Sequence, residues 1–229
     1  MSHAEKEITR IMSILTSAIA EHRLPPGTRL KEEVIAGLLE ANRNHVRAAL
    51  RRLAIEIKVV SLVPNKGARV AQPSRDEAKD VFSARLVLEK AVVEQAVAQM
   101  SPAKANALLK QLEKEAQAIR ANDRQRMIRE SGEFHKLIAQ ISGNRVLAEL
   151  LEGLITRTSL IIALYQETTD VKCALEEHQR LAQALIDKNP DTAIALTEEH
   201  MHSIESHLQL DLVEKEIDLG LALGVNFSV

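Results

Sequence analysis

Tryptophan is absent from this chain of 229 residues, which also contains only one tyrosine and three phenylalanines. Hydrophobic residues still make up 45% of the sequence, and most of them are Leu, Ala, Ile and Val. Aromatic and β-branched residues favour strands, whereas Leu and Ala favour helices. The composition therefore predicts a mainly α-helical protein rather than a β-sandwich.

Cysteine and long apolar runs are also scarce. The single Cys173 has no partner for an internal disulfide, which agrees with a reducing cytoplasm. No apolar run reaches the roughly 18 residues that a membrane-spanning helix needs. The first residues lack the apolar core and cleavage site of a signal peptide. We therefore expect a cytoplasmic protein with no membrane partner.

The net charge of −2 is unevenly distributed. Residues 1–75 contain 13 Lys and Arg against 7 Asp and Glu, whereas the remainder contains 17 against 25. A basic segment of +6 joined to an acidic one of −8 suits binding to a polyanion at one end of the chain. Ordinary surface variation is the alternative explanation.

Residues 1–72 are predicted to form a winged helix-turn-helix. Hydrophobic periodicity and turn residues indicate helices over 6–22, 31–39 and 43–54, followed by strands over 58–63 and 68–71. Two prolines and a glycine at 25–27 end the first helix, and Asn42 is a candidate N-cap of the third.

The rest of the chain is predicted to be an all-helical bundle. After a linker at 73–77, residues 78–212 form the helical domain, and 213–229 form a C-terminal tail. Ser101-Pro102, Gly143-Asn144 and Asn189-Pro190 mark breaks between helices. The expected helices span 75–99, 102–121, 123–141, 144–166, 170–188 and 190–211.

The predicted helix at 43–54 has side chains suited to contacting DNA bases. Val46, Ala49, Leu50 and Leu53 share one face, and Arg43, Asn44 and Arg47 project from the other. Arginine can bond guanine bidentately, and asparagine can do the same with adenine in the major groove. A solvated basic helix face is the alternative.

The segment LPPGTRLKEEVIAGLLEANRNHVRAALRRLAIE, followed by VPNKGARVA, resembles the winged helix-turn-helix of the GntR family of bacterial regulators. The resemblance implies DNA contacts from the start of the recognition helix and from the wing. The residues at those positions are Asn42, Arg43, Asn44, Arg47, Lys66 and Gly67. Glu33 departs from the family pattern, since a basic residue is frequent there, and a carboxylate repels phosphate.

His135, His178 and His200 fall on three separate predicted helices. Imidazole is a common ligand of transition metals, and three converging rings would leave coordination positions open for a small molecule. Three unrelated surface or core histidines are the alternative.

The segments VFSARLVLE, EFHKL…GN, EHQR and EH at 81–89, 133–144, 177–180 and 199–200 resemble the FCD domain, the helical partner in one GntR branch. The resemblance implies that the three histidines hold a divalent metal with an Asp or Asn four residues before the first. It also implies that an arginine on the first helix, here Arg85, binds a carboxylate effector. Arg157 is a second candidate ligand residue.

Ser131 stands where the FCD pattern has its carboxylate or amide. A hydroxyl is a weaker ligand, so three outcomes stay open: zinc, manganese or nickel held by three histidines and water, a weak site, or a lost one. For Arg85 the alternative is an ion pair with Glu89, one helical turn away.

These patterns together predict a ligand-responsive DNA-binding transcription regulator, not an enzyme. We expect a homodimer on a roughly palindromic operator, acting as a repressor released by a small organic acid. A metal-dependent hydrolase is one alternative, although no His-Glu-x-x-His motif is present. A ligand-independent architectural DNA-binding protein is another.

Overall fold

The computed structural model of the chain describes residues 2–64, 66–165 and 171–208. Two compact units are distinguished by their internal contacts. Unit 1 comprises Met1–Ser74 and Ser159–Tyr165, and unit 2 comprises Arg75–Thr158 and the described part of Gln166–Gln209. The tail expected at 213–229 lies outside the described residues.

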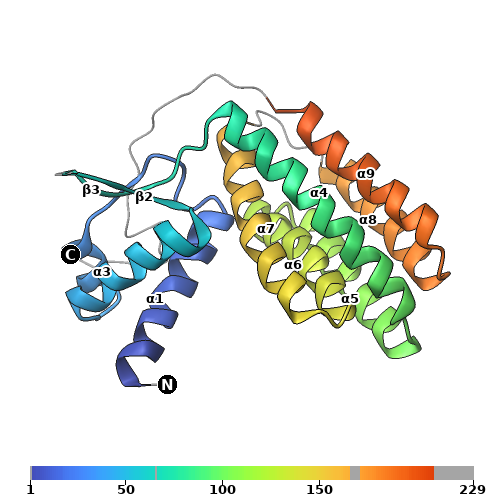
Figure 1. Cartoon of the computed structure of the whole chain (residues 1–229), viewed down its shortest axis with the longest axis horizontal. Helices are drawn as coiled ribbons and strands as arrows, with labels where there is room; N and C mark the ends of the chain where they lie inside the picture. Colours follow the sequence, from blue (N-terminus) through green and yellow to red (C-terminus); the bar gives the residue numbers. More distant parts are fainter. Residues whose placement is uncertain (1, 65, 166–170, 209–229) are drawn as a thin grey trace. The chain divides into compact units, whose positions relative to one another are not determined.

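The described part of unit 1 contains three α-helices, one π-helical turn and a small antiparallel sheet (Figure 1). Its elements are α1 (His3–Ala20), β1 (Arg29–Leu30), α2 (Glu32–Leu38), α3 (Arg43–Arg52), the π-helical turn η1 (Leu53–Ile57), β2 (Val60–Val63) and β3 (Gly67–Val70). The strand order is β1-β3-β2. The predicted winged helix-turn-helix is thus confirmed.

Two features of unit 1 were not predicted. Strand β1 pairs with β3 through Arg29↔Arg69 and Leu30↔Ala68; at two residues it is too short to show an alternating pattern. The helix predicted over 43–54 ends at Arg52 and is followed by η1. The residue after η1, Lys58, lies in the left-handed region, with φ 61°.

Two glycines make the turns around the sheet possible. Gly27 has φ +83°, and a Cβ there would lie 3.1 Å from Nε2 of Gln72. Gly67, at the start of β3, has φ +80°. Side-chain-bearing residues rarely adopt this conformation, so both positions favour glycine for a local reason.

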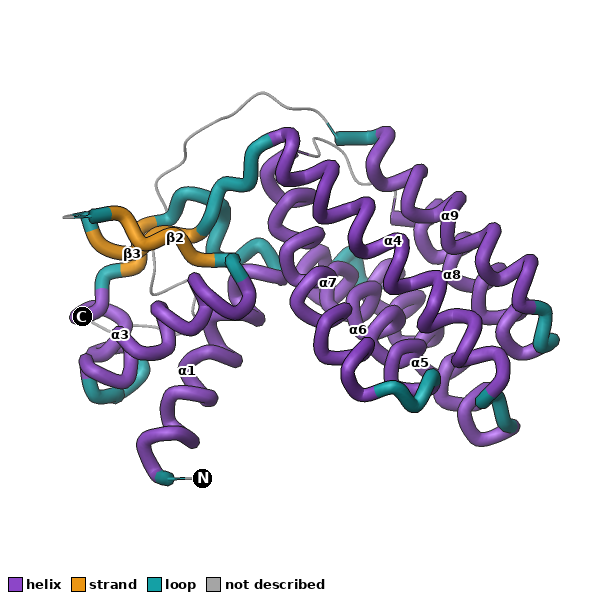
Figure 2. Tube along the Cα trace, in the orientation of Figure 1, coloured by secondary structure: helices purple, strands orange, loops and turns teal. Residues whose placement is uncertain are grey.

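Unit 2 is built from helices, as Figure 2 shows in purple. These are α4 (Arg75–Ala98), α5 (Pro102–Arg120), α6 (Arg124–Ile141), α7 (Arg145–Tyr165, whose last residues belong to unit 1), α8 (Val171–Ile186) and α9 (Pro190–Ser206). The all-helical prediction is confirmed, although the helix expected over 190–211 ends at Ser206.

Capping side chains set several helix starts. Ser101 accepts a hydrogen bond from the Lys104 amide at the start of α5, and Asn189 accepts one from the Thr192 amide at the start of α9. In both helices proline follows the cap, where its missing N–H costs nothing. The first turns of α5 and α9 are therefore fixed locally by sequence.

Each unit has its own hydrophobic core. The core of unit 1 lies among α1, α2, α3 and the sheet, and Leu160 near the end of α7 packs in it. In unit 2, α5 packs against α6 and α8, and α4 packs against α6 and α9. Among the described residues, no helix is both long and apolar enough to cross a membrane.

Candidate metal centre and nucleic-acid interface

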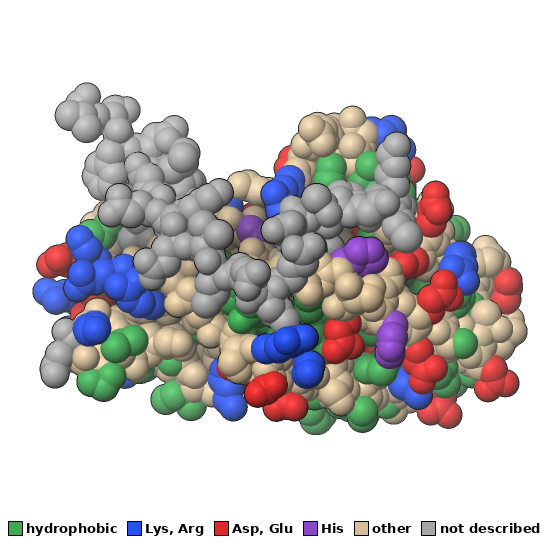
Figure 3. Space-filling view, turned by 90° about the horizontal axis from the view of Figure 1, so that it is seen from above, with side chains coloured by type: hydrophobic (Ala, Val, Ile, Leu, Met, Phe, Trp, Pro, Cys, Tyr) green, Lys and Arg blue, Asp and Glu red, His purple; other side chains and the backbone are tan. Residues whose placement is uncertain are grey.

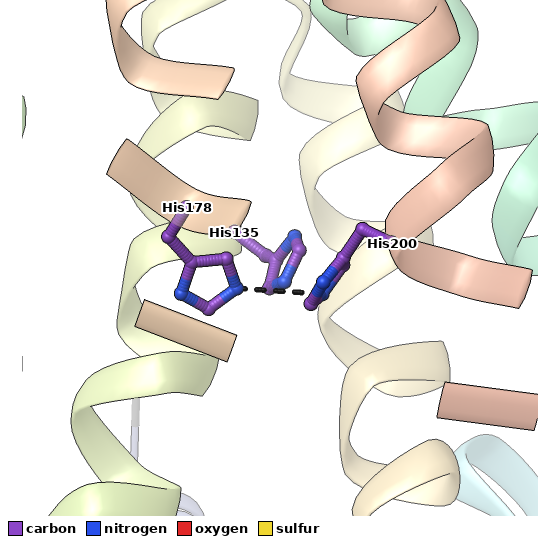
Figure 4. Close-up of side chains that lie close together, drawn as sticks. All are labelled: His135, His178 and His200. Atoms are coloured by element: carbon purple, nitrogen blue, oxygen red, sulfur yellow. Dashed lines mark hydrogen bonds between the residues drawn. The ribbon is translucent and has the colours of Figure 1, made fainter. Parts of the chain in front are cut away.

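The histidines of α6, α8 and α9 converge in the interior of unit 2. His135, His178 and His200 are each at most 3% exposed. One ligand nitrogen from each lies within 4.8 Å of the other two, and Nε2 of His178 is 3.3 Å from Nε2 of His200. Figure 4 shows the three rings lying close together, carried by separate helices.

Helical periodicity explains why these histidines are buried. His178 shares a face of α8 with Leu181, Ala182 and Leu185, which are all buried, because residues three, four and seven positions apart lie on one side of a helix. Phe134, fully buried on α6, stacks on His178 with ring centroids 4.5 Å apart. Apolar packing thus shields the cluster from water.

A glutamate lies behind each histidine. The Nδ1 atoms are paired as follows: His135 with Glu89 of α4 at 3.1 Å, His178 with Glu115 of α5 at 3.0 Å, and His200 with Glu177 of α8 at 2.6 Å. An ionised carboxylate only accepts hydrogen bonds, so each Nδ1 carries the proton and donates it. Each neutral ring then has an unprotonated Nε2.

This donor set fits a divalent cation. Nitrogen lone pairs that lie this close together repel one another unless a proton or a metal ion lies between them. Carboxylates behind imidazoles are the usual outer partners of metal-bound histidines.

Burial and charge act together on the protonation of this network. Burial lowers the pKa of His135 from 6.5 to about 3, against the opposing effect of Glu89. Burial also lowers the pKa of His200, against its hydrogen bond to Glu177. For Glu89, burial opposes ionisation, but the charges of His135 and Arg85 outweigh it and hold the pKa well below its usual value. At neutral pH, His135 and His200 are therefore neutral and Glu89 is ionised.

Ser131 lies one turn before His135 on α6 and is half-buried. Among the described residues, the cluster of candidate ligands contains the three histidines and no carboxylate. The protein side chains therefore offer three nitrogen ligands, which leaves further coordination positions for water or a bound molecule.

The two candidate effector-binding arginines lie in different surroundings. Arg85 is buried on α4, and its Nε donates to Glu89 at 2.9 Å; the intrahelical pair considered from the sequence is therefore present. The charge of Arg85 also lowers the pKa of His135 and His200, after the larger effect of burial. Arg157 on α7 instead pairs with Glu77 at 2.8 Å, and no described contact joins it to the histidines.

The predicted DNA-contacting residues lie at the start of α3 and in the wing. Asn42 is the N-cap of α3, with its side chain accepting from the Asn44 amide at 2.8 Å. Asn44, Lys66 and Gly67 are exposed. In the space-filling view, Lys and Arg side chains gather over unit 1 on the face drawn, and acidic side chains are more frequent over unit 2 (Figure 3).

Glu32 of α2 forms ion pairs with two arginines of α3, Arg43 and Arg47. Arg47 donates to it from Nη2 at 2.7 Å and from Nε at 2.9 Å, and Arg43 approaches it at 3.4 Å. The hydrogen bond from Arg47 keeps the pKa of Glu32 below its usual value. The side chains of Arg43 and Arg47 stay 59% and 43% exposed, so both remain accessible to a ligand.

Glu89, Glu115 and Glu177 are not recognisable as partners of the histidines from the sequence alone. For Glu115, the sequence does indicate a buried position. It falls on the face of α5 that carries buried Leu108 and Leu112, and a charged residue on an apolar face requires a buried partner. The identity of that partner could not be read from the same signal.

Comparison with known families and proteins agrees with this architecture. Residues 8–70 match the family model described as bacterial regulatory proteins, gntR family, and residues 80–203 match that of the FCD domain. The HTH-type transcriptional regulator YdhC of Bacillus subtilis is 26% identical over 194 residues, covering 82% of this chain and 85% of its own. The HTH-type transcriptional repressor NanR of Klebsiella aerogenes is 27% identical over 198 residues, covering 76% and 74%.

Solved structures show the same fold. E. coli McbR/YncC superposes with a TM-score of 0.79 at 24% identity, covering 89% of this chain and 95% of that chain. A putative transcriptional regulator GntR from Rhodococcus sp. RHA1 gives a TM-score of 0.77 at 24% identity, covering 88% and 96%.

Metal content tests the histidine cluster directly. Protein purified without chelator or nickel resin, then loaded with zinc and desalted, is expected to hold about one metal ion per chain by elemental analysis. His178→Ala removes one of three nitrogen ligands and should abolish this. His207→Ala, which removes an exposed histidine, is the matched control. Absence of metal in the wild type after loading with zinc, manganese and nickel would contradict the site.

Acidification should destabilise the metal-free protein. His135 is neutral in the folded state, with a pKa of about 3, and titrates near 6.5 when unfolded. The unfolded state therefore binds more protons below about pH 6.5, so stability falls as pH falls. Between pH 7 and pH 5 this group alone should remove about 2 kcal/mol. Urea unfolding of the wild type and of His135→Gln in chelator, at both pH values, measures the effect. An equal pH dependence in the two proteins would rule it out.

Proposed function

This chain belongs to the GntR family of bacterial regulatory proteins and carries the family's FCD domain, so it is a DNA-binding transcription regulator, and we propose that it is a homodimeric repressor. In this proposal unit 2 holds a divalent metal and a small carboxylate effector, and unit 1 binds a roughly palindromic operator. Binding of the effector releases the DNA.

The convergence of three buried imidazoles, each supported by a carboxylate, carries this proposal. His135, His178 and His200 would hold the ion through Nε2. The ion would supply positive charge and open coordination positions that fix the oxygen atoms of an effector. Arg85 would bind the effector carboxylate from the α4 side. Its positive charge adds to burial in lowering the pKa of both His135 and His200. Arg157 has less support, because its described ion pair is with Glu77.

The recognition helix supports the DNA-binding half of the proposal. Arg43, Asn44 and Arg47 lie at its start, where side chains of a helix-turn-helix reach base edges. Glu32 accepts hydrogen bonds from both Nε and Nη2 of Arg47. Surface ion pairs of this kind contribute little free energy, so the arginines can exchange this carboxylate for bases or phosphates. Lys66 and Gly67 would approach the backbone and minor groove from the wing.

An enzymatic role has less support. A hydrolase built on this centre would need a general base near the open coordination positions. The glutamates nearest to the histidines bond to Nδ1 instead, on the side of each ring opposite Nε2. NanR, one of the relatives, is described as a repressor, in agreement with the proposed role.

Release of DNA is proposed to follow from a shift between two arrangements of the dimer. Two winged units bind successive half-sites only at one separation. An effector that binds one arrangement more tightly increases its population, and the shift cannot exceed that difference in affinity. Repression is then relieved if the favoured arrangement places the winged units at a different separation.

Operator selection tests the DNA-binding residues. Selection from random duplex DNA should return a roughly palindromic site, with half-sites about one helical turn apart. Arg47→Ala should cost about 1–3 kcal/mol in binding and relax the preference at one base pair of each half-site, because it removes a base contact. Lys66→Ala should weaken binding to all sequences alike. Fluorescence anisotropy measures both.

Arg120→Ala serves as the control for these variants, since Arg120 is an exposed, ion-paired arginine of α5 and should bind the operator like the wild type. Full affinity and unchanged base preference in Arg47→Ala would contradict the proposed role of the recognition helix.

Effector binding is tested by thermal shift of the zinc-loaded protein with a panel of small carboxylates, since a ligand of the folded state raises the melting temperature. An effective acid should also release the selected operator. Arg85→Met should weaken its binding about 10- to 100-fold, as expected for loss of a charged hydrogen bond, and Arg120→Ala should not. An acid that acts equally on Arg85→Met would exclude Arg85 from the site.

A further inference from the structure

One carboxylate in unit 2 joins the candidate effector-binding arginine to a histidine of the cluster. Glu89 is 1% exposed. Its Oε1 accepts from Nε of Arg85 at 2.9 Å, and its Oε2 accepts from Nδ1 of His135 at 3.1 Å. Arg85 and Glu89 lie one turn apart on α4, whereas His135 is on α6. The contact therefore connects two helices as well as two functional groups.

Glu115 provides a natural comparison. It is equally buried, at 1% exposed, and both of its oxygens lie within 3.1 Å of Nδ1 of His178. Among the described residues, no ion pair joins Glu115 to a lysine or arginine. The two glutamates thus occupy the same place behind a histidine and differ in the presence of Arg85.

We propose that Glu89 is a positioning residue that keeps the proton of His135 on Nδ1 and couples metal affinity to the occupancy of Arg85. The first half rests on hydrogen-bond chemistry. A guanidinium can only donate, and Nδ1 of His135 donates when Nε2 is to bind a metal. A carboxylate, with two acceptor oxygens, satisfies both donors at once.

The coupling rests on the proposed function and follows from the same contacts. An effector carboxylate on Arg85 competes with Glu89 for the guanidinium. Glu89 then interacts more strongly with His135, and a stronger outer hydrogen bond makes an imidazole a better metal ligand. Because binding linkage is reciprocal, metal binding strengthens effector binding by the same factor.

Glu89→Gln should break this arrangement in a specific way. Glutamine has one acceptor oxygen, and its amide nitrogen only donates. Arg85 cannot accept a hydrogen bond, so it takes the oxygen, and the amide then faces Nδ1 of His135. His135 can accept that hydrogen bond only by moving its proton to Nε2, which prevents the nitrogen from binding metal. In Glu115→Gln no arginine competes, so the oxygen can still accept from His178.

Two measurements distinguish the variants. Nitrogen-15 NMR of the metal-free protein should show the His135 proton moving to Nε2 in Glu89→Gln, and the His178 proton staying on Nδ1 in Glu115→Gln. Zinc affinity, measured by competition with a chromophoric chelator, should fall about 10- to 100-fold in Glu89→Gln and less in Glu115→Gln. Circular dichroism and gel filtration matching the wild type establish that both variants fold.

A second substitution tests whether Arg85 causes the loss of zinc affinity in Glu89→Gln. In Arg85→Met/Glu89→Gln the glutamine oxygen is free to accept from His135, so zinc affinity should recover relative to Glu89→Gln alone. Equal losses in the two glutamine variants, an unchanged His135 proton in Glu89→Gln, or no recovery in the double variant would each overturn the proposal. If the wild type itself fails to bind zinc, the proposed metal function fails, whereas the NMR comparison still decides the role of Glu89.

Discussion

Unit 2 depends on the pairing of buried imidazoles with carboxylates that are buried or, at Glu177, half-buried. Removing an ionised carboxylate from water costs several kcal/mol unless charges and hydrogen bonds compensate. Here that compensation comes from other parts of the bundle: Glu89 of α4 meets His135 of α6, Glu115 of α5 meets His178 of α8, and Glu177 of α8 meets His200 of α9. Each contact joins two helices and fixes which of their residues face each other. The same contacts leave Nε2 of each ring unengaged by a glutamate, and one ligand nitrogen of each histidine lies within 4.8 Å of the other two, so the interactions that make this interior possible also make it suitable for a cation.

Unit 1 uses the same pairing of opposite charges with a different consequence. Glu32 contacts Arg43 and Arg47, but these side chains are partly exposed, so water screens the interaction and little is lost when it breaks. The arginines are held in place without being sequestered. Burial therefore separates the two roles: an exposed ion pair positions groups that must exchange partners, and a buried network fixes groups that must not move.

Much of the fold could be predicted from sequence because its signals are local. Ser101 and Asn189, each followed by proline, cap α5 and α9 at the helix breaks predicted from the sequence. Asn42 caps α3. Strand β1 was missed because its two residues are a strand only through their pairing with β3. The end of the recognition helix was misplaced for a similar reason, since the π-helical turn that follows Arg52 leads into the first strand of the wing.

For the site, the sequence by itself determined which side chains were available: three histidines on three helices, Arg85 on the first helix of the bundle, and Ser131 in place of a stronger ligand. Only the tertiary structure decided that a glutamate supports each histidine and that Glu89 is shared with Arg85. Helical periodicity specifies which face a residue occupies, but not which residue of a distant helix faces it. Glu115 and His178 are 63 positions apart, and they meet because α5 packs on α8.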